Sequence, residues 1–331
     1  MIGHYYFFGV PMPLSLLLAL SADEPTSGER LAEQFGCTRA AIAKRINVLR
    51  GLGVLIEALP RLGYRLNYRY SWWNELALRE HLNNLAALTN CHVLSRVDST
   101  NIWMRDHISQ AAPGETHIAV TDFQQKGRGR RGREWMSLPG RQITASIGHV
   151  SAQGPVAWLG VAIAVGLSLA SSLRQLGWPV DLKWPNDLWL HGEKLGGILV
   201  EMDAMAEGPS RLIIGFGINE LLLESEKQLL EKPAASLQDM NIDYDRHALL
   251  AVLCSNLIQM LTDFSRFGLA SWRQLWPSYD ALLGRIVSFE YQGEWREGCA
   301  EGIDEQGALL IKCGSELVHC HSGEVSVRIN P

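Results

Sequence analysis

Residues Gln124–Trp135, QQKGRGRRGREW, place three glycines among five basic side chains in a chain whose formal net charge is -5. Glycine lets a backbone turn its N–H groups toward an anion, and arginine presents a planar fork to phosphate oxygens. The stretch lies between strand-like runs at 117–124 and 141–148. It matches neither the P-loop pattern nor a Rossmann fingerprint. We therefore interpret it as an internal loop that clamps a small phosphate-bearing ligand, rather than a localisation signal or an RNA-binding tail.

A second cluster of charged residues supports this interpretation. The stretch 181–202, DLKWPNDLWLHGEKLGGILVEM, contains Lys183, Asn186, Asp187 and Lys194 close together. Two lysines suit the neutralisation of two anionic groups, and Asp187 is a candidate contact for a divalent metal. Lys194 taken alone is better explained as a solvated surface charge. The two clusters together favour an anion-binding site.

The surroundings of both clusters predict a mixed α/β domain from about residue 81 to 280. Apolar strand-like runs at 117–123, 140–150, 195–203 and 211–219 alternate with helix-like stretches. The longest helix-like stretches are 158–177 and 247–264. From about residue 281 the pattern changes to short strands and turns, which predicts a small β-barrel.

The N-terminal segment has a different charge balance and predicts a winged helix-turn-helix. Residues 34–74 hold seven basic residues against one acidic residue, a net charge of +6 that indicates a polyanionic partner. A helix is expected over 26–36, with Thr26 and Glu29 in capping-box spacing. A second helix is expected over 38–53, followed by a wing over 54–67.

In this domain the second helix is expected to lie in the major groove of DNA, with the wing against backbone phosphate. Ile42, Ile46 and Leu49 recur at helical spacing on the buried side of that helix. The candidate DNA-binding residues are Thr38, which is also the expected N-cap, and Arg39, Lys44, Arg45 and Arg61. A small helical domain with a solvated basic face remains the alternative.

The overall composition predicts a soluble, cytoplasmic protein of two or three domains. The chain has 331 residues, of which 47% are hydrophobic and 20% charged, so collagen-like, coiled-coil and disordered classes are excluded. Residues 1–22 lack a basic start and contain two prolines, so we interpret them as an unassigned extension over 1–13 plus a first core helix. No run reaches the ~18 apolar residues of a membrane span. The six thinly spread cysteines indicate reduced thiols.

Taken in order, five motifs resemble the biotin-protein ligase family. They are DSTN (98–101), GRGRRGREW (127–135), KWPND (183–187), KLGGILVE (194–201) and GFGIN (215–219). With a winged helix ahead and a small barrel behind, the chain resembles the bifunctional bacterial type, which combines a ligase with a DNA-binding repressor. The resemblance covers almost the whole chain.

The resemblance implies an α+β multidomain fold with three parts. Residues 1–70 would form the winged helix-turn-helix DNA-binding domain. Residues 78–280 would form the biotin- and ATP-binding ligase domain, of the class II synthetase or biotin-lipoate ligase type. Residues 281–331 would form an SH3-like β-barrel.

The implied activity is a two-step, ATP-dependent, AMP-forming ligation. Biotin and ATP, with Mg²⁺, would give biotinyl-5'-AMP, and biotin would then pass to a lysine of the biotin carboxyl carrier domain of acetyl-CoA carboxylase or a related carboxylase. The adenylate-bound form would favour a homodimer and the binding of operator DNA, with biotinyl-5'-AMP as corepressor. No membrane partner is implied.

The resemblance also assigns residues to roles. Biotin would be contacted by Ser99, Thr100, Asn101, Gln124, Arg128, Gly129, Arg130, Lys194 and Gly197. ATP or the adenylate would be contacted by Gly127, Arg128, Arg130, Arg133, Trp135, Asn186, Asp187 and Asn219. The catalytic cations would be Arg130, Lys183 and Lys194, and Asp187 would be the contact for Mg²⁺.

Some of these residues have simpler explanations. Ser99 and Thr100 are also suited to capping the following helix, Trp135 to a hydrophobic core and Asn219 to a strand end. His319, Cys320 and His321 raise a metal-site hypothesis, against which they are ordinary strand residues.

Two other functions remain open at this point. A ligand-sensing transcriptional regulator without ligase activity would be expected to lack Lys194 or the glycine and arginine loop. A lipoate ligase would be expected to lack the winged helix. The wing itself departs from relatives that carry a more basic, glycine-rich turn, because Leu62 stands between Arg61 and Gly63.

Overall fold

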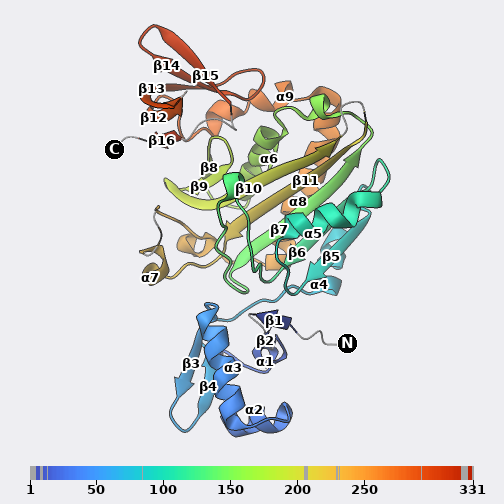
Figure 1. Cartoon of the computed structure of the whole chain (residues 1–331), viewed down its shortest axis with the longest axis vertical. Helices are drawn as coiled ribbons and strands as arrows, with labels where there is room; N and C mark the ends of the chain where they lie inside the picture. The colour runs from blue at the N-terminus through green and yellow to red at the C-terminus, as the bar shows by residue number, and fades with distance from the viewer. Residues whose placement is uncertain are drawn as a thin grey trace.

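The computed structural model places three bodies one after another along the long axis of the molecule (Figure 1). It describes residues 5–7, 10–12, 14–83, 85–204, 208–228, 230, 232–291, 293–321 and 327–329. The rest of the 1–13 extension lies outside these residues. The N-terminal domain lies at one end, the large mixed domain in the middle and the C-terminal strands at the other end.

The N-terminal domain consists of a hairpin, a short bundle of helices and a wing. Its elements are β1 (Tyr5–Phe7), β2 (Val10–Met12), α1 (Leu14–Leu18), α2 (Gly28–Gln34), α3 (Arg39–Gly51), β3 (Ile56–Leu59) and β4 (Gly63–Leu66). Thr38 caps α3 by accepting a hydrogen bond from the Ala41 amide at 3.2 Å. Ile42, Ile46 and Leu49 are fully buried, as their spacing predicts. The helix-turn-helix and its wing are therefore confirmed.

The start of α2 differs from the prediction. Ser27, and not Thr26, is the N-cap, and its hydroxyl accepts from the Arg30 amide at 3.1 Å. The backbone of Thr26 instead pairs with Tyr64 of the wing, with both N···O distances at 2.9 Å. Thr26 is thus held in extended conformation by a strand that is remote in sequence, and the cap moves on by one residue.

Ser27→Ala is expected to cost about 1 kcal/mol of helix stability, because it leaves a first-turn amide without its capping oxygen. Hydrogen–deuterium exchange at the amides of α2 measures this loss. Thr26→Ala is the matched control, since only its backbone makes the pairing contacts. Equal deprotection of α2 in both variants would contradict this assignment of the cap.

The central domain is built on one seven-stranded sheet. Its strands are β5 (Asn90–Leu94), β6 (Thr116–Thr121), β7 (Gln142–Ser151), β8 (Val180–Lys183), β9 (Asp187–Leu190), β10 (Glu193–Ala204) and β11 (Ser210–Asn219). They lie in the order β5-β6-β7-β11-β10-β9-β8, with β5 parallel to β6 and the other neighbours antiparallel. The mixed α/β prediction is confirmed.

Helices cover both faces of this sheet. The helices of this part of the chain are α4 (Glu75–Leu82), α5 (Thr100–His107), α6 (Val161–Gln175), α7 (Glu224–Lys227), α8 (Arg246–Phe267) and α9 (Ala270–Arg273). Helices α6 and α8 pack together over the face that carries Ile118 and Val120, whereas α5 packs over the face that carries Ala119. This alternation follows from the two-residue period of a strand.

Two helical segments are long and apolar enough to span a membrane by composition alone. They are Pro155–Gln175 and Arg246–Phe267, of which 67% and 56% of the most apolar window is buried inside the protein. Both supply large side chains to the central core, including Leu173 and Leu257. Their hydropathy is therefore that of core helices.

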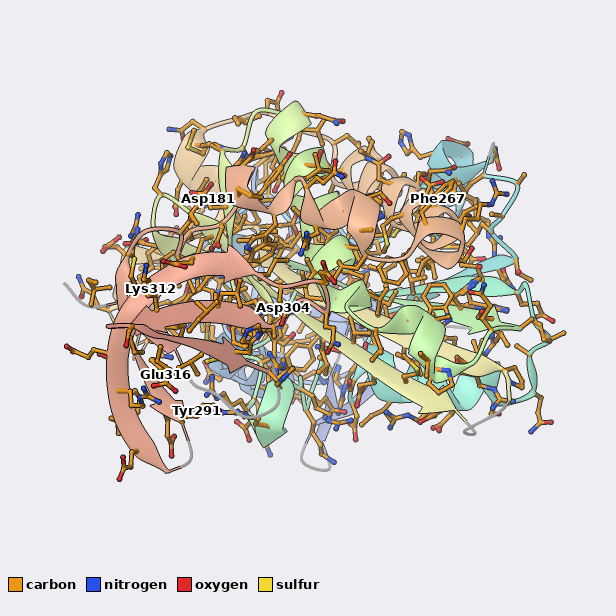
Figure 2. All side chains as sticks on the ribbon, turned by 90° about the horizontal axis from the view of Figure 1, so that it is seen from above. Asp181, Phe267, Tyr291, Asp304, Lys312 and Glu316 are labelled. Carbon is orange, nitrogen blue, oxygen red and sulfur yellow. The ribbon has the colours of Figure 1, made fainter. Side chains whose placement is uncertain are left out.

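The C-terminal body is a small antiparallel β domain. Its strands are β12 (Ile286–Tyr291), β13 (Glu294–Ile303), β14 (Leu309–Cys313), β15 (Glu316–Cys320) and β16 (Val327–Ile329), in the order β15-β14-β13-β12-β16. Figure 2 shows it along one side of the molecule, with Lys312, Glu316 and Tyr291 on this sheet and Phe267 at the far side. The Trp184 indole donates to the Gly307 carbonyl at 3.0 Å and ties the domain to the central core.

The N-terminal and central domains share buried contacts. Arg141, fully buried immediately before β7, donates to the Gly53 carbonyl at 3.1 Å and pairs with Glu226 at 2.6 Å. Phe123, which directly precedes the glycine and arginine loop, packs into the hydrophobic core of the N-terminal domain. The chain crosses between the domains before residue 78, because Trp73 already belongs to the central core.

Candidate functional site

A cavity of roughly 230 Å³ lies where the glycine and arginine loop crosses the central sheet. The cavity brings together most of the residues singled out by the sequence. They are Ser99, Thr100, Asn101, Gln124, Arg128, Gly129, Arg130, Arg133, Trp135, Lys183, Asn186, Asp187, Lys194 and Gly197. Segments separated by up to about a hundred residues in the chain thus form one site.

One wall of the cavity is a hydrogen-bonded cluster at the start of α5. The side-chain Oε1 of Gln124 accepts from the Thr100 amide at 2.7 Å and from the Thr100 hydroxyl at 3.1 Å. The Ser146 hydroxyl on β7 lies 2.7 Å from the Thr100 hydroxyl and 2.6 Å from the side-chain Oδ1 of Asn101. Ser99 is the N-cap residue of α5, yet its hydroxyl makes no capping hydrogen bond. These buried polar groups are suited to holding a small polar ring in a fixed orientation.

The loop itself closes as a tight hairpin. The Trp135 amide donates to the Gly127 carbonyl at 2.9 Å, and the Gly129 amide donates to the Arg133 carbonyl at 2.7 Å. A Cβ at position 127 would lie 2.4 Å from the Trp135 carbonyl oxygen, so only glycine fits there. Gly127 therefore shapes the loop and lies outside the cavity lining, and its contact with the adenylate stays a prediction.

The opposite wall carries positive charge. The Lys194 ammonium lies 2.7 Å from the Asp187 carboxylate, and Arg130 donates to the Asn186 side chain at 3.2 Å. Burial lowers the pKa of Lys183, and the nearby Lys194 and Lys232 lower it further. A bound anion stabilises a partly desolvated cluster of cations strongly, because it replaces the favourable interaction with water that burial removes.

Arg130 differs from the other arginines of the loop. It is half-buried, whereas Arg128, Arg131 and Arg133 are exposed. Burial lowers the pKa of its guanidinium, and the charge of Arg131 acts in the same direction. Asn186 is itself fixed, since its side chain donates to the Ile198 carbonyl at 2.7 Å. Arg130 is therefore the arginine that the fold positions most firmly in the cavity.

The floor of the cavity is formed by glycines on β10 and β11, where Gly197 pairs with Gly217. A Cβ at Gly217 would lie 2.6 Å from the Trp135 ring, and one at Gly215 would lie 2.1 Å from the Asn101 side chain. Both glycines thus make room for predicted site residues. The two glycines are two residues apart in GFGIN, which places them on one face of the strand. Neither was predicted to have a role in the site.

Asn219 lies outside the cavity lining. Its side-chain amide donates to the Ala235 carbonyl at 3.0 Å, and its carbonyl oxygen accepts from Gln142 at 3.0 Å. These bonds join the end of β11 to β7 and to the segment that follows α7. Asn219 thus has a structural role at a strand end, and its contact with the adenine side stays a prediction.

Several cavity residues were not singled out from the sequence. Glu201 on β10 is not part of the lining, but it accepts from the lining residue Asn101 at 2.9 Å and faces Arg128 at 3.5 Å. The additional lining residues are Arg131, Glu134, Thr144, Trp184, Ile198, Leu199, Gly215, Phe216, Gly217 and Lys232. Most are apolar or glycine residues whose role depends on strand pairing, which sequence spacing does not show.

The predicted DNA-binding residues lie on α3 and on the wing. Thr38, Arg39 and Lys44 are exposed, and Arg61 lies in the turn of the wing with a φ of 65°. Arg45 is half-buried, with its guanidinium 3.8 Å from a cysteine sulfur. Arg39 pairs with Glu29 at 2.7 Å on the surface, an interaction that an exposed phosphate would displace at little cost.

The metal-site hypothesis for the C-terminal strands is not supported. His319 pairs with Asp304 at 2.8 Å and Cys320 is buried. Among the described residues, His319, Cys320 and His321 do not form a group with metal-binding spacing. Successive side chains on a strand point to opposite faces, which separates these residues.

Comparison with known protein families matches each part of the chain. Residues 14–65 match a model of an HTH domain, 93–219 match the biotin/lipoate A/B protein ligase family, and 282–328 match the biotin protein ligase C-terminal domain. The bifunctional ligase/repressor BirA of Escherichia coli (strain K12) is 36% identical over 318 residues, which is 96% of this chain and 97% of that protein. The corresponding protein of Bacillus subtilis (strain 168) is 28% identical over 94% of this chain and 96% of its own length.

Solved structures agree with these sequence matches. Biotin protein ligase from Aquifex aeolicus, solved in complex with biotin and ATP, superposes with a TM-score of 0.60 and 27% identity. It covers 73% of this chain and 100% of its own. Since near-full-length identity of 36% extends over all three domains, the chain belongs to the biotin-protein ligase family, in its bifunctional form with an N-terminal DNA-binding domain.

Proposed function

We propose that this protein joins biotin to ATP as biotinyl-5'-AMP and then transfers biotin to a lysine of a biotin carboxyl carrier domain. The observation that carries this proposal is the single cavity that combines a polar cluster, a glycine and arginine clamp and desolvated lysines. The relatives are named as ligase and repressor, and the solved relative holds biotin and ATP.

In the first step the biotin carboxylate attacks the α-phosphorus of ATP, the bond to pyrophosphate breaks and a mixed anhydride forms. Both reactants are anions, so their approach requires fixed positive charge. Arg130, Lys183 and Lys194 line the same cavity and supply it. Because the chemistry needs only alignment and charge compensation, no side-chain nucleophile is required.

The polar wall is suited to biotin and the cationic wall to phosphate. Thr100, Asn101 and Gln124 offer donors and acceptors for a cyclic urea, with Ser99 beside them. The exposed Arg128 and Arg133 lie where the loop can fold over the adenylate. An ordered loop would exclude water and so protect the anhydride from hydrolysis.

Asp187 fits a role in holding Mg²⁺. Its carboxylate lies in a cavity that is also lined by lysine and arginine side chains. Mg²⁺ commonly binds one or two carboxylates together with substrate phosphates. The ion would supply charge neutralisation at the departing pyrophosphate. Asp187 also orients Lys194 through their ion pair, whether or not the ion is bound.

In the second step the acceptor lysine amine attacks the activated carbonyl carbon, an amide bond forms and AMP leaves. The amine must reach the cavity in its neutral form. An acceptor domain that presents its lysine on a turn would enter beside the exposed arginines of the loop. We assign acceptor recognition to this side of the central domain.

We propose that repression is coupled to the cavity through contacts between the segment after the loop and the DNA-binding domain, such as the hydrogen bond from Arg141 to the Gly53 carbonyl. Leu138 lies just beyond the loop, and a Cβ at Gly53 would approach it to 2.9 Å. Biotinyl-5'-AMP would act as corepressor if its binding orders the loop in the arrangement that favours a homodimer on operator DNA. The protein is expected to act in the cytoplasm, where its substrates and operator meet.

The decisive experiment is transfer of labelled biotin to a purified carboxylase carrier domain with ATP and Mg²⁺. Lipoate and reactions without ATP serve as controls. ATP-dependent, biotin-selective labelling supports the ligase. Folded protein that binds biotin but labels no acceptor would leave the ligand-sensing regulator without ligase activity as the better description.

Arg130→Gly is expected to release biotinyl-5'-AMP into solution, because it removes the half-buried cation and adds backbone freedom to the loop. Adenylate retained on the protein after gel filtration measures the effect, for which we expect at least a tenfold faster loss. Lys126→Ala removes the same charge from an exposed ion pair outside the cavity and is the control. Unchanged retention in Arg130→Gly would contradict the clamp.

A further inference from the structure

Three histidines from separate elements converge at the end of α5 that is opposite to the polar wall of the cavity. His92 comes from β5, His107 from the last residue of α5 and His117 from β6. One side-chain nitrogen from each lies within 4.8 Å of the others. Segments of β5, α5 and β6 are all needed to form this cluster, so it is a product of the fold and not of local sequence.

Two nitrogens of the cluster are buried and lack a hydrogen-bond partner among the described residues. They are Nε2 of His92 and Nδ1 of His117. The other nitrogen of His117 lies 3.2 Å from a carboxylate oxygen of Glu115. Glu115 therefore fixes the tautomer in which Nε2 carries the proton and Nδ1 keeps a free lone pair. A carboxylate behind an imidazole is the usual arrangement around metal-binding histidines.

The cluster is open to solvent on one side. His107 is exposed, His92 is half-buried and His117 is buried. The cluster is therefore accessible to a small ion from the side of His107.

We infer that His92, His107 and His117 form a binding site for a divalent transition-metal ion such as Zn²⁺. Three imidazoles with one open position for water are an established ligand set for Zn²⁺. Metal–nitrogen bonds of about 2.1 Å in a tetrahedral site place ligand atoms about 3.4 Å apart. The observed spacing thus needs a small inward movement, which the exposed His107 side chain is free to make.

Ring packing is the competing explanation for the cluster. The Trp103 ring stacks on His107 with centroids 4.6 Å apart and lies 5.0 Å from His92. The histidine rings also pack on one another, with centroids 4.4 Å apart for His92 and His107 and 5.9 Å apart for His92 and His117. Ring packing leaves the buried nitrogens of His92 and His117 without a hydrogen-bond partner, whereas a metal ion bound through these nitrogens would satisfy both.

The site would also connect to the ligand cavity through α5. This helix starts with residues of the polar wall and ends at His107 about 10 Å further on. A bound ion would tie its C-terminal end to β5 and β6. The expected consequence is a higher Tm with Zn²⁺, without a requirement for biotin or ATP.

The test is titration of the full chain, purified without a polyhistidine tag, with Co²⁺ and with Zn²⁺. We expect one ion per chain by calorimetry, a visible Co²⁺ absorption typical of tetrahedral nitrogen ligands, and displacement by Zn²⁺. His107→Ala removes an exposed ligand, so the fold is retained, and should weaken binding at least tenfold. The variant His117→Gln should abolish the Co²⁺ spectrum.

His319→Gln is the matched control, because it removes an exposed histidine that pairs with a carboxylate elsewhere. It should leave Co²⁺ binding and the Zn²⁺-dependent rise in Tm unchanged. Binding that is absent from the wild type, or that persists undiminished in His107→Ala, would overturn the assignment. Circular dichroism of each variant verifies that the comparison is made between folded proteins.

Discussion

Lys194→Ala is expected to slow formation of biotinyl-5'-AMP by about 100- to 1000-fold, the usual cost of removing one fixed group that stabilises developing charge. Lys194 lines the cavity beside Lys183, and its ammonium is positioned by Asp187 at 2.7 Å. Its loss leaves that carboxylate unpaired and facing the incoming anions. The direct measurement is the rate of pyrophosphate release in a single turnover with saturating biotin and ATP.

Lys227→Ala is the control for this change. Lys227 pairs with Asp239 at 2.8 Å, nearly the distance of the Lys194 pair, but it does not line the cavity. Transfer from pre-formed biotinyl-5'-AMP should be affected less than adenylate formation, because the second step no longer joins two anions. A near-normal rate of pyrophosphate release in Lys194→Ala would remove the role assigned to this lysine.

Arg246→Met is expected to lower the free energy of unfolding by about 3–5 kcal/mol, because it leaves two buried carboxylates without their cation. Arg246 lies 2.7 Å from Glu220 and 3.5 Å from Asp122, and all three side chains are about 95% buried. It also stacks on Trp73, with the guanidinium carbon 3.9 Å from the ring centroid. Denaturant unfolding measures the loss.

This loss should depend on pH. Burial raises the pKa of Asp122 to about 7, although Arg246 lowers it in part, and burial also raises that of Glu220. A raised pKa means that the folded state holds a proton which the unfolded chain has released, so this contribution to stability falls from about pH 4 to pH 7. Without the arginine both groups favour protonation further, and the loss should be larger at pH 8 than at pH 5.

Asp122→Asn separates charge from shape at this site. The amide keeps an acceptor for the Trp73 backbone N–H, which donates to Asp122 at 3.1 Å. The variant should be tolerated, and its stability should fall less between pH 4 and pH 7 than that of the wild type. An equal pH dependence in the two proteins would show that Asp122 does not titrate in this range.

The sequence predicts the three-part organisation because each part carries a local pattern. The spacing of Ile42, Ile46 and Leu49 defines a helix, and alternating apolar runs define the strands. The cap of α2 was predicted wrongly because Tyr64, remote in sequence, holds Thr26 in extended conformation. Local spacing contains no information on such pairing.

The site residues were predictable where the type of side chain indicates the chemistry. They were not predictable where their position depends on the register of strand pairing. Lysine, arginine and glutamine at motif positions pointed to the cavity, and the structure places them there. Strand pairing alone brings Ser146 and Glu201 into contact with lining residues, because it sets Ser146 opposite Gly215 and places Glu201 on the adjacent strand. The His92 cluster went unnoticed since its three members are spaced irregularly in the chain.

The packing of Phe123 links the central domain to the N-terminal domain, so deleting the N-terminal domain would affect the central one. Phe123 is a residue of the central domain, but it is buried among side chains of the N-terminal domain, and Gln124 follows it directly. Deleting residues 1–70 would expose Phe123 to water and remove the Gly53 carbonyl that accepts from Arg141. The DNA-binding domain thus supports the polar wall of the cavity, and its removal would leave the residue before Gln124 without its packing partners.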